Sequence, residues 1–419
     1  MKSRPANRPK SALYRAIGRG LALAVAALAL IVVALNVTIS TAASRTQQVA
    51  IALSLPFVSA EARSSAADLL DQVAASGQDI GIDDPRGVSR NLAENALEQQ
   101  AADPVAARVL GQLAMERGEA ENAEGFFAYA DRLSRRDGRT QLYLAESALA
   151  RNDFDAAVRR YSNALKAGAI SSEEMLPRLL ALSETEASRR ALGEELGRQP
   201  QWASGVWRDY LEVSQSAEQI AGVGLIAWDS GLDNDILASE TMERLIDLGG
   251  IADAAKLYRL IAPDRRTGML LRDGDFEKLG TLTPFDWKLS ARGRYSALPV
   301  PHPNGEGSVL QLDATSGSRG VVAQQVLTLS PGAYVLSGQV GQSDEDRLAR
   351  PEIIVTCVES GAVLGEFVAP SAPLQGISFS EEFTVPSACA FQRIEVVFGS
   401  PATKPYTTAW LDDLSLRSR

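Results

Sequence analysis

The middle of the chain repeats itself at a fixed interval. Shifted by 34 positions against itself, the sequence matches residues of similar size: Leu110 with Leu144, Gly111 with Ala145, Ala114 with Ala148, Gly118 with Asn152, Ala123 with Ala157, Phe127 with Tyr161, and Ala130 with Ala164. A fixed period of this length is typical of repeat architectures, in which each unit covers the apolar face of its neighbour. From about Val88 to Pro263 the chain is also rich in alanine and leucine and is interrupted by Gly, Asn and Asp at helix-length intervals, which predicts consecutive helices.

Each repeat divides into two helices. Gly118 is placed to end the first helix, and Ala123, Phe127 and Ala130 then share one face of the second at i, i+4 and i+7. In period and positions this pattern resembles the tetratricopeptide repeat. The resemblance implies antiparallel helix pairs that approach through small residues, with one aromatic ring between successive pairs. We therefore expect a tetratricopeptide-like α-solenoid over residues 88–265.

The repeat pattern weakens on both sides of the two clear copies. Residues Asn95 to Pro104 are interpreted as the second helix of a preceding, degenerate repeat, and the match fades after Leu165. The small and aromatic residues recover their spacing in Thr241–Pro263, but at an offset that is not a multiple of the repeat interval. We therefore predict an irregular insert and four or five helical pairs in all.

The resemblance also indicates where a partner would bind. In tetratricopeptide repeats, residues that face inward from each first helix often hold a peptide or a partner protein. The matching positions here are Arg108, Gln112, Glu116, Arg139 and Glu146. The alternative is that these residues form a solvated helix face.

The N-terminus predicts a membrane anchor. An uninterrupted apolar run extends from Leu21 to Leu35 and the uncharged stretch continues to Ser40, which gives the ~20 residues that a spanning helix needs. Six basic residues precede the run, and the first acidic residue is Glu61. By the positive-inside rule we expect a cytoplasmic leader at 1–20, a transmembrane helix at 21–40 and a linker or helical stalk at 41–87. A signal peptide cleaved after Thr41-Ala42-Ala43 is the alternative.

Charge and composition narrow the function classes. Beyond Ala60 the chain contains more acidic than basic side chains, 52 against 35, so it offers no basic face to nucleic acid. A single His, His302 in a Pro/Gly loop, disfavours His-based catalysis and multi-His metal sites. Arginine and alanine prevail over lysine, as in GC-rich bacterial genomes. We therefore expect a single-pass bacterial inner-membrane protein with a cytoplasmic N-terminus and a periplasmic body.

The chain changes character at about Met269–Arg272. Short alternating or apolar runs separated by turn residues follow to the C-terminus, among them VLQLDA, AYVLSGQV, EIIVTCV and FQRIEVVF. About eight such runs, spaced by turn signals, predict one antiparallel β-sandwich over residues 270–419. The predicted fold class is therefore multidomain, α and then β.

Motifs in this region carry a second resemblance. The sequences LLRDGDFE, PFDW, QQVLTLSPGAYVLSGQV and WLDDLSL occur in this order between Leu270 and Leu416. They resemble the jelly-roll, galactose-binding-like modules of carbohydrate-active proteins, although Asp273 stands where Asn is commoner. The resemblance implies a glycan-binding sandwich.

Two kinds of site follow from that resemblance. Many such modules hold a structural calcium between the opening and closing strands, and the matching acidic residues are Asp275, Glu277, Asp412 and Asp413. Aromatic rings for sugar stacking are available at Trp287, Tyr295, Tyr334, Tyr406 and Trp410. The alternatives are strand ends without a metal and aromatic rings buried in the core of a small sandwich.

The two cysteines, Cys357 and Cys389, both lie in predicted strands of the exported body. In an oxidising compartment such a pair is expected to form a disulfide, and two unlinked buried thiols are the alternative.

These observations favour a non-enzymatic, membrane-anchored periplasmic scaffold without catalytic residues. Its repeats would dock a protein partner and its sandwich would bind a polysaccharide, in envelope or exopolysaccharide assembly. The alternatives are a carbohydrate-active enzyme or its accessory subunit, and a pure protein-interaction scaffold.

Overall fold

The computed structural model describes residues 58–77, 81–262, 270–291, 293–305 and 307–419. The predicted leader and the transmembrane helix at 21–40 lie outside these ranges. Within them, no helix combines the length and apolar character that crossing a membrane requires. The chain forms two compact units that divide between Ser171 and Ser172, a position inside the span 88–265 that the sequence assigns to helical repeats.

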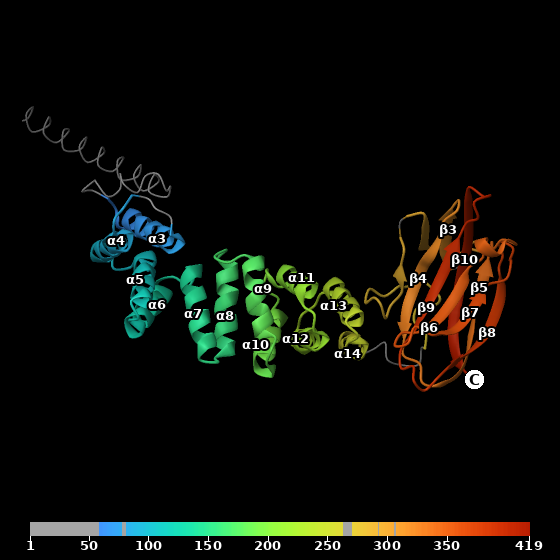
Figure 1. The fold of residues 1–419 in the computed structure, drawn as a ribbon. Helices are drawn as coiled ribbons and strands as arrows, with labels where there is room; N and C mark the ends of the chain where they lie inside the picture. The colour runs from blue at the N-terminus through green and yellow to red at the C-terminus, as the bar shows by residue number, and fades with distance from the viewer. Residues whose placement is uncertain (1–57, 78–80, 263–269, 292, 306) are drawn as a thin grey trace, which may run out of the picture. The chain divides into compact units, whose positions relative to one another are not determined.

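The first unit consists of helices. They are α3 (Ala60–Ser76), α4 (Pro85–Gln99), α5 (Pro104–Glu116), α6 (Ala120–Leu133), α7 (Gly138–Ala150) and α8 (Phe154–Lys166) (Figure 1). Helix α7 follows α5, and α8 follows α6, at the interval that the sequence repeat predicts. The carboxylates of Asp103, Asp137 and Asp153 accept backbone N–H groups at the starts of α5, α7 and α8.

Small residues and one aromatic ring join successive helices, as predicted. Phe127 of α6 is 1% exposed, and a Cβ atom added at Gly111 of α5 would lie 2.9 Å from its ring. The ring also stacks on Tyr143 of α7, with centroids 3.5 Å apart. The matching aromatic residue of the next pair, Tyr161, is equally buried. The repeat therefore sets the spacing of α5 to α8 through close packing.

The second unit opens with six more helices. They are α9 (Ser172–Leu182), α10 (Glu186–Gly197), α11 (Ala203–Val213), α12 (Ala217–Asp229), α13 (Asp235–Asp247) and α14 (Ile251–Ile261). Helices α9, α11 and α13 pack in one row, and α10, α12 and α14 in another. The starts of α9, α11 and α13 are closer together in the chain than those of α5 and α7. Equivalent residues of these helices therefore do not align when the sequence is compared with itself at the repeat interval. Ten of the described helices, α5 to α14, lie wholly within residues 88–265, where the sequence predicts four or five helical pairs.

Two five-stranded antiparallel sheets form the sandwich, which confirms the predicted architecture. The strands are β1 (Lys288–Leu289), β2 (Tyr295–Pro301), β3 (Ser308–Thr315), β4 (Arg319–Leu327), β5 (Gly332–Gly341), β6 (Glu352–Cys357), β7 (Val363–Val368), β8 (Ile377–Val385), β9 (Gln392–Gly399) and β10 (Tyr406–Ser418), with a 3₁₀ helix at Arg347–Ala349. One sheet has the order β1-β4-β9-β6-β7, and the other has the order β2-β3-β10-β5-β8. Alternate residues of both sheets fill a shared apolar core.

The segment before β1, which contains Arg272 and Gly274, is hydrogen-bonded to both sheets. Arg272 and the fully buried Gln325 of β4 exchange two hydrogen bonds of 3.0 and 3.1 Å. On the other sheet, the backbone N–H of Leu414 in β10 donates to the Gly274 carbonyl at 2.9 Å. A Cβ at position 274 would lie 1.9 Å from the Leu414 carbonyl oxygen, so only glycine allows this approach.

Helices α13 and α14 are joined to the sandwich through residues 281–288. The Tyr258 hydroxyl of α14 donates to the Asp286 carboxylate at 3.0 Å, and its ring packs on Phe285. Glu243 of α13 forms an ion pair with Lys288 at 2.8 Å. Since Asp286 is fully buried and also accepts the backbone N–H of Leu282, this junction is part of the core of the second unit.

The predicted disulfide is present. Cys357 at the end of β6 is bonded to Cys389, which precedes β9, and their Cα atoms are 5.7 Å apart. The bridge therefore ties a strand of one sheet to the loop that leads into its neighbour.

Candidate functional site

The sandwich carries a hollow of about 570 Å³ on the outer face of strands β10, β5 and β8, next to residues 270–275. We call it the polar hollow. The polar residues that line it from the three strands are Ser337, Gln339, Ser378, Asp413, Ser415 and Arg417.

Strand alternation places these side chains outside. In β5, Ser337 and Gln339 alternate with the core residues Leu336 and Val340, so they face away from the second sheet. In β10, Ser415 lies in the same way between two buried leucines. The hydroxyls of Ser337 and Ser415 are hydrogen-bonded across the strands at 2.9 Å.

A β-bulge places the acidic residue of the hollow. The pairing of β10 with β5 shifts between Asp412 and Ser415, and Asp413 has φ 51° in this irregularity. The Gln339 side-chain amide donates to Asp413 Oδ2 at 2.8 Å. In a regular strand, Asp413 would point to the opposite face from Asp412, which lies across from Gln339; the bulge instead brings the Asp413 carboxylate beside the Gln339 amide on the outer face.

Charge around the hollow is mainly negative. Asp273, Asp275 and Asp413 line it together with one cation, Arg417. Beside Asp413, burial raises the pKa of Asp412 to about 6, against an ordinary value of 3.8, and repulsion from Asp413 adds to this effect. Such a surface suits a neutral polar ligand better than a polyanion.

The four carboxylates expected to bind calcium are brought near one another, but their oxygens do not converge. Glu277 Oε1 accepts the backbone N–H of Ser308, and Asp413 Oδ2 accepts from Gln339. In the part of the chain that the structure describes, the only group that places three ligand atoms within 4.8 Å of one another is Cys357, Glu359 and Cys389. No three of Asp275, Glu277, Asp412 and Asp413 place their carboxylate oxygens within this distance of one another.

Four of the five aromatic candidates are packed inside the sandwich or under its loops. Trp287 is 3% exposed and packs on Phe276, Tyr334 donates to a backbone carbonyl from a buried position, and Tyr295 is half-buried. Trp410 belongs to the outer face but is 2% exposed, because the loop containing Leu374 covers it and accepts its indole N–H. Three of these rings are buried, and the ring of Tyr295 is half-buried.

Tyr406 is 52% exposed, at the start of β10. Next to it, Thr408 Oγ1 donates to Asp313 Oδ1 at 2.9 Å, and Gln311 Nε2 donates to the other oxygen of that carboxylate. Burial and the neighbouring Asp313 raise the pKa of the Tyr406 hydroxyl. Tyr406 is thus the one sequence-predicted aromatic candidate that presents an open ring.

Three of the five residues expected to bind a partner, Arg108, Gln112 and Arg139, are bonded to other side chains of the first unit. Arg108 is 3% exposed and forms ion pairs with Asp68 at 2.8 Å and with Asp137 at 3.0 Å. It also donates to the Gln112 side chain, and Arg139 binds the same Asp68 oxygen at 2.9 Å. Burial acts to raise the pKa of Asp68, but hydrogen bonding and attraction from Arg108 hold it below the ordinary value.

The two glutamates of that set lie nearer the surface. Glu116 is paired with Arg86 of α4 at 2.6 Å, and Glu146 is exposed. Beside Glu116, Asp71 of α3 is 6% exposed and its Oδ1 has no hydrogen-bond partner. Burial and repulsion from Glu116 raise the pKa of Asp71 to about 6.

Sequence reasoning missed the two groups of residues that organise these regions. Asp68 and Asp71 lie in the stretch expected to be a linker or stalk, and Asp68 reaches α5 and α7 only in the folded unit. Ser337 and Gln339 lie inside the quoted motif QQVLTLSPGAYVLSGQV, but the motif gave them no role, and Ser378 lies outside the quoted motifs. Their signal is the alternation of polar and core residues along β5, which identifies an outer face but not a hollow.

Comparisons with known proteins give likenesses to solved structures for the C-terminal region of the chain. No protein-family model and no curated protein match the chain. Among solved structures, one titled "CBM4 structure and function" has 13% identity and TM-score 0.27, and covers 36% of this chain and 99% of its own. A module titled TmCBM61 in complex with beta-1,4-galactotriose has 13% identity and TM-score 0.28, with 36% and 100% coverage. "Family 16 Carbohydrate Binding Module-2" has 16% identity and TM-score 0.26, with 36% and 99% coverage.

Proposed function

We propose that this protein is a non-enzymatic scaffold that binds a neutral glycan at the polar hollow of its sandwich. The observation that carries the proposal is the set of hydroxyl, amide and carboxylate groups on the outer face of β10, β5 and β8 around a hollow of about 570 Å³. That volume is within the ~300–1,000 Å³ range of small-ligand sites.

The chemistry of the hollow suits a sugar. A pyranose presents several hydroxyls that each donate and accept hydrogen bonds, and serine, glutamine and aspartate side chains complement both roles. The Ser337–Ser415 and Gln339–Asp413 pairs are already oriented by their mutual hydrogen bonds, which reduces the entropy lost on binding. Because three acidic residues and one arginine line the hollow, we expect neutral glycans to bind better than polyuronates.

The helical part is proposed to dock a protein partner as a tetratricopeptide-like array. The regular interval between the hairpins α5/α6 and α7/α8 and the Phe127–Gly111 contact support this assignment.

Anchoring by residues 21–40, a periplasmic body and a role in envelope or exopolysaccharide assembly belong to the same proposal. Mass analysis of the mature N-terminus tests the anchor, because a chain that starts at Ser44 would be a cleaved, unanchored product.

The glycan proposal is tested with the full chain on immobilised polysaccharides. Retention is expected on at least one of cellulose, xylan and galactan, and weaker retention on polygalacturonate. Gln339→Ala should reduce retention about 10-fold, which corresponds to ~1.4 kcal/mol and to the loss of an oriented hydrogen-bonding group. The matched control is Gln324→Ala, which removes the same side chain from the outer face of the other sheet and should leave retention unchanged.

Two results would contradict the proposal. One is the absence of retention on every polymer by a folded chain. The other is a Gln339→Ala variant that is retained as well as Gln324→Ala, because the hollow would then play no part in binding.

A structural calcium at Asp275, Glu277, Asp412 and Asp413 stays a prediction. Thermal unfolding of the full chain with and without millimolar Ca²⁺ tests it. A bound ion would raise the melting temperature of the wild type, and Asp412→Asn would abolish the increase, because binding to the folded state alone shifts the equilibrium by mass action. Equal melting temperatures with calcium and with a chelator would reject the site.

A further inference from the structure

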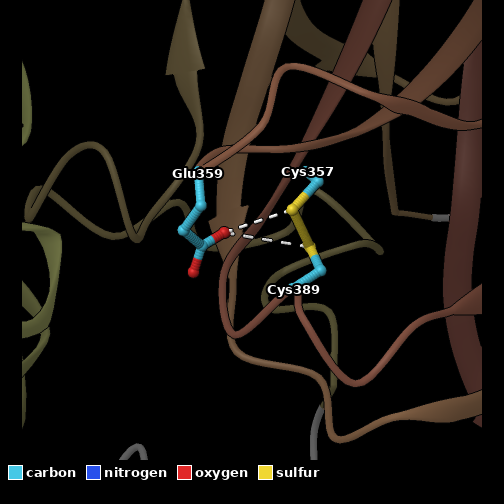
Figure 2. A group of neighbouring side chains, drawn as sticks. All are labelled: Cys357, Glu359 and Cys389. Atoms are coloured by element: carbon cyan, nitrogen blue, oxygen red, sulfur yellow. Dashed lines mark hydrogen bonds between the residues drawn. A yellow bond between two sulfur atoms is a disulfide. The ribbon is translucent and has the colours of Figure 1, made fainter.

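Three metal-ligating side chains meet at the disulfide end of the sandwich, away from the strands that form the polar hollow. Glu359 Oε2 lies 3.2 Å from Cys357 Sγ and 3.9 Å from Cys389 Sγ. Figure 2 shows the carboxylate turned toward both sulfur atoms, and the ligand atoms of all three residues lie within 4.8 Å of one another.

The backbone holds this carboxylate in place. Glu359 Oε1 accepts the backbone N–H groups of Ala390 at 3.1 Å and of Phe391 at 3.0 Å. The second oxygen is thereby directed at the sulfurs. Cys357 and Cys389 are 2% and 1% exposed, whereas Glu359 is exposed and leaves an approach from solvent.

The disulfide by itself does not account for this arrangement. A disulfide has no proton to donate, so it cannot form a hydrogen bond to Glu359 Oε2. Two thiols or a cation would interact favourably with the same oxygen. The carboxylate is therefore suited to a second state of the cluster, in which the sulfurs are not bonded to each other.

We propose that reduction of the Cys357–Cys389 bridge creates a zinc site in which both thiolates and Glu359 are ligands. In a tetrahedral zinc site with Zn–S of about 2.3 Å and Zn–O of about 2.0–2.2 Å, sulfur and oxygen ligands lie ~3.6 Å apart. The observed S···O distances of 3.2 and 3.9 Å lie on either side of this value. The required rearrangement is that the two sulfurs separate to ~3.8 Å.

The chemistry is balanced by an external dithiol or phosphine reductant. The S–S bond takes up two electrons and two protons and breaks, which yields two thiols while the reductant is oxidised. Zinc binding then releases both thiol protons, because the thiolate is the form that ligates. The fourth position of the metal is left for water or for another ligand.

A neighbouring amide suits the thiolate form. Gln392 is fully buried, and its Nε2 lies 3.6 Å from Cys389 Sγ while it also donates to the Cys389 carbonyl at 2.9 Å. Hydrogen bonds to ligating sulfurs orient them and spread their charge, as second-shell groups do in metal sites.

The experiment uses the full chain, reduced with a phosphine, desalted without oxygen and titrated with Co²⁺ as a spectroscopic substitute for Zn²⁺. We expect one equivalent to bind with sulfur-to-cobalt charge-transfer absorption, and Zn²⁺ to displace it. The oxidised chain should give no such absorption.

Two variants assign the ligands. Glu359→Gln retains an oxygen for the two backbone N–H groups but removes the charge, and it should weaken Co²⁺ binding at least ~10-fold. Glu381→Gln, an exposed position on β8, is the matched control and should bind as the wild type does. The double variant Cys357→Ser and Cys389→Ser should lose the charge-transfer band.

Three outcomes would overturn the proposal. They are no metal uptake by the reduced chain, whether it has kept or lost its β-sheet circular dichroism; equal affinities of Glu359→Gln and wild type; and a charge-transfer band that survives in the double serine variant. Because glycan retention is measured on the oxidised chain, none of these results bears on the polar hollow.

Discussion

The first helical unit and the sandwich differ in whether their polar side chains are paired internally or line an open surface. In the helices, Arg108 is 3% exposed between Asp68 and Asp137, so the face expected to receive a partner is satisfied by its own unit. In the sandwich, Ser337 and Gln339 form pairs across strands and still line an open hollow. A match to a family's binding position is therefore a weaker indication of a site than a polar side chain that lines an open hollow.

Burial explains the difference. A guanidinium removed from water must be paired, and the pairs then use the donors that a ligand would need. Serine and glutamine on an outer sheet face need no such pairing, so they keep part of their hydrogen-bonding capacity for another molecule.

The largest expected effect tests the helical side of this comparison. Arg108→Ala should lower the free energy of unfolding by ~3–5 kcal/mol, because it removes the buried guanidinium that is the main partner of the half-buried Asp68 and Asp137. Denaturant unfolding followed by circular dichroism measures it. Arg139→Ala, whose side chain is 39% exposed, is the control and should cost under ~1 kcal/mol. Equal effects of the two variants would mean that the Arg108 cluster is not a buried network.

The next effect concerns the covalent link of the sandwich, for which the helices have no counterpart among the described residues. Cys357→Ser and Cys389→Ser should each destabilise the oxidised protein by ~2–4 kcal/mol, since the bridge closes a chain separation of 32 residues. A reductant should lower the stability of the wild type but not that of the variants. Unchanged melting of the variants would contradict a stabilising bridge.

A smaller effect on the free energy of unfolding is expected at two buried carboxyls, Asp71 in the helices and Asp412 in the sandwich. Both have pKa values raised to about 6, so the folded chain keeps them protonated where the unfolded chain, at about 3.8, releases the proton. Each therefore lowers stability as pH rises from about 4 to about 6, by at most ~3 kcal/mol.

Unfolding free energies at several pH values measure this loss. Asp412→Asn and Asp71→Asn should each remove part of it, so that the variants gain stability over the wild type as pH increases. A difference from the wild type that does not depend on pH would show that burial does not perturb these carboxyls.

The smallest effect is expected at the open ring of the sandwich. Tyr406→Ala should change the free energy of unfolding by less than ~0.5 kcal/mol, because the side chain is 52% exposed. Tyr334→Ala, at a buried position of the same sheet, should cost ~3 kcal/mol and serves as the reference. Similar losses for both tyrosines would place Tyr406 in the core.

The sequence predicts elements best where the pattern is local. Gly118 and Phe127, with their counterparts Asn152 and Tyr161, specify hairpins whose contacts lie within one or two helices. Helix α9 still starts at the repeat interval after α7, but α11 and α13 start at shorter intervals, which leaves helix formation intact and removes the match from α11 onward. The strands of the sandwich follow from alternation, which a half-buried sheet imposes on every strand.

The candidate sites were less predictable because they depend on side chains from distant segments. Arg108 meets Asp68 across 40 residues, and Glu359 meets Cys389 across 30. The four acidic residues expected to bind calcium are close in the fold, yet the oxygens of Glu277 and Asp413 bind Ser308 and Gln339 rather than a common point.

The sequence by itself determined the change from helices to strands near residue 270, the two clear repeats and the cysteine pair. These features follow from periodicity and residue chemistry along a short stretch of chain. Only the tertiary structure decided which polar groups bind one another and which remain at a surface, because that depends on strand register, on the bulge at Asp413 and on burial. The polar hollow and the Cys357–Glu359–Cys389 cluster are products of those three factors.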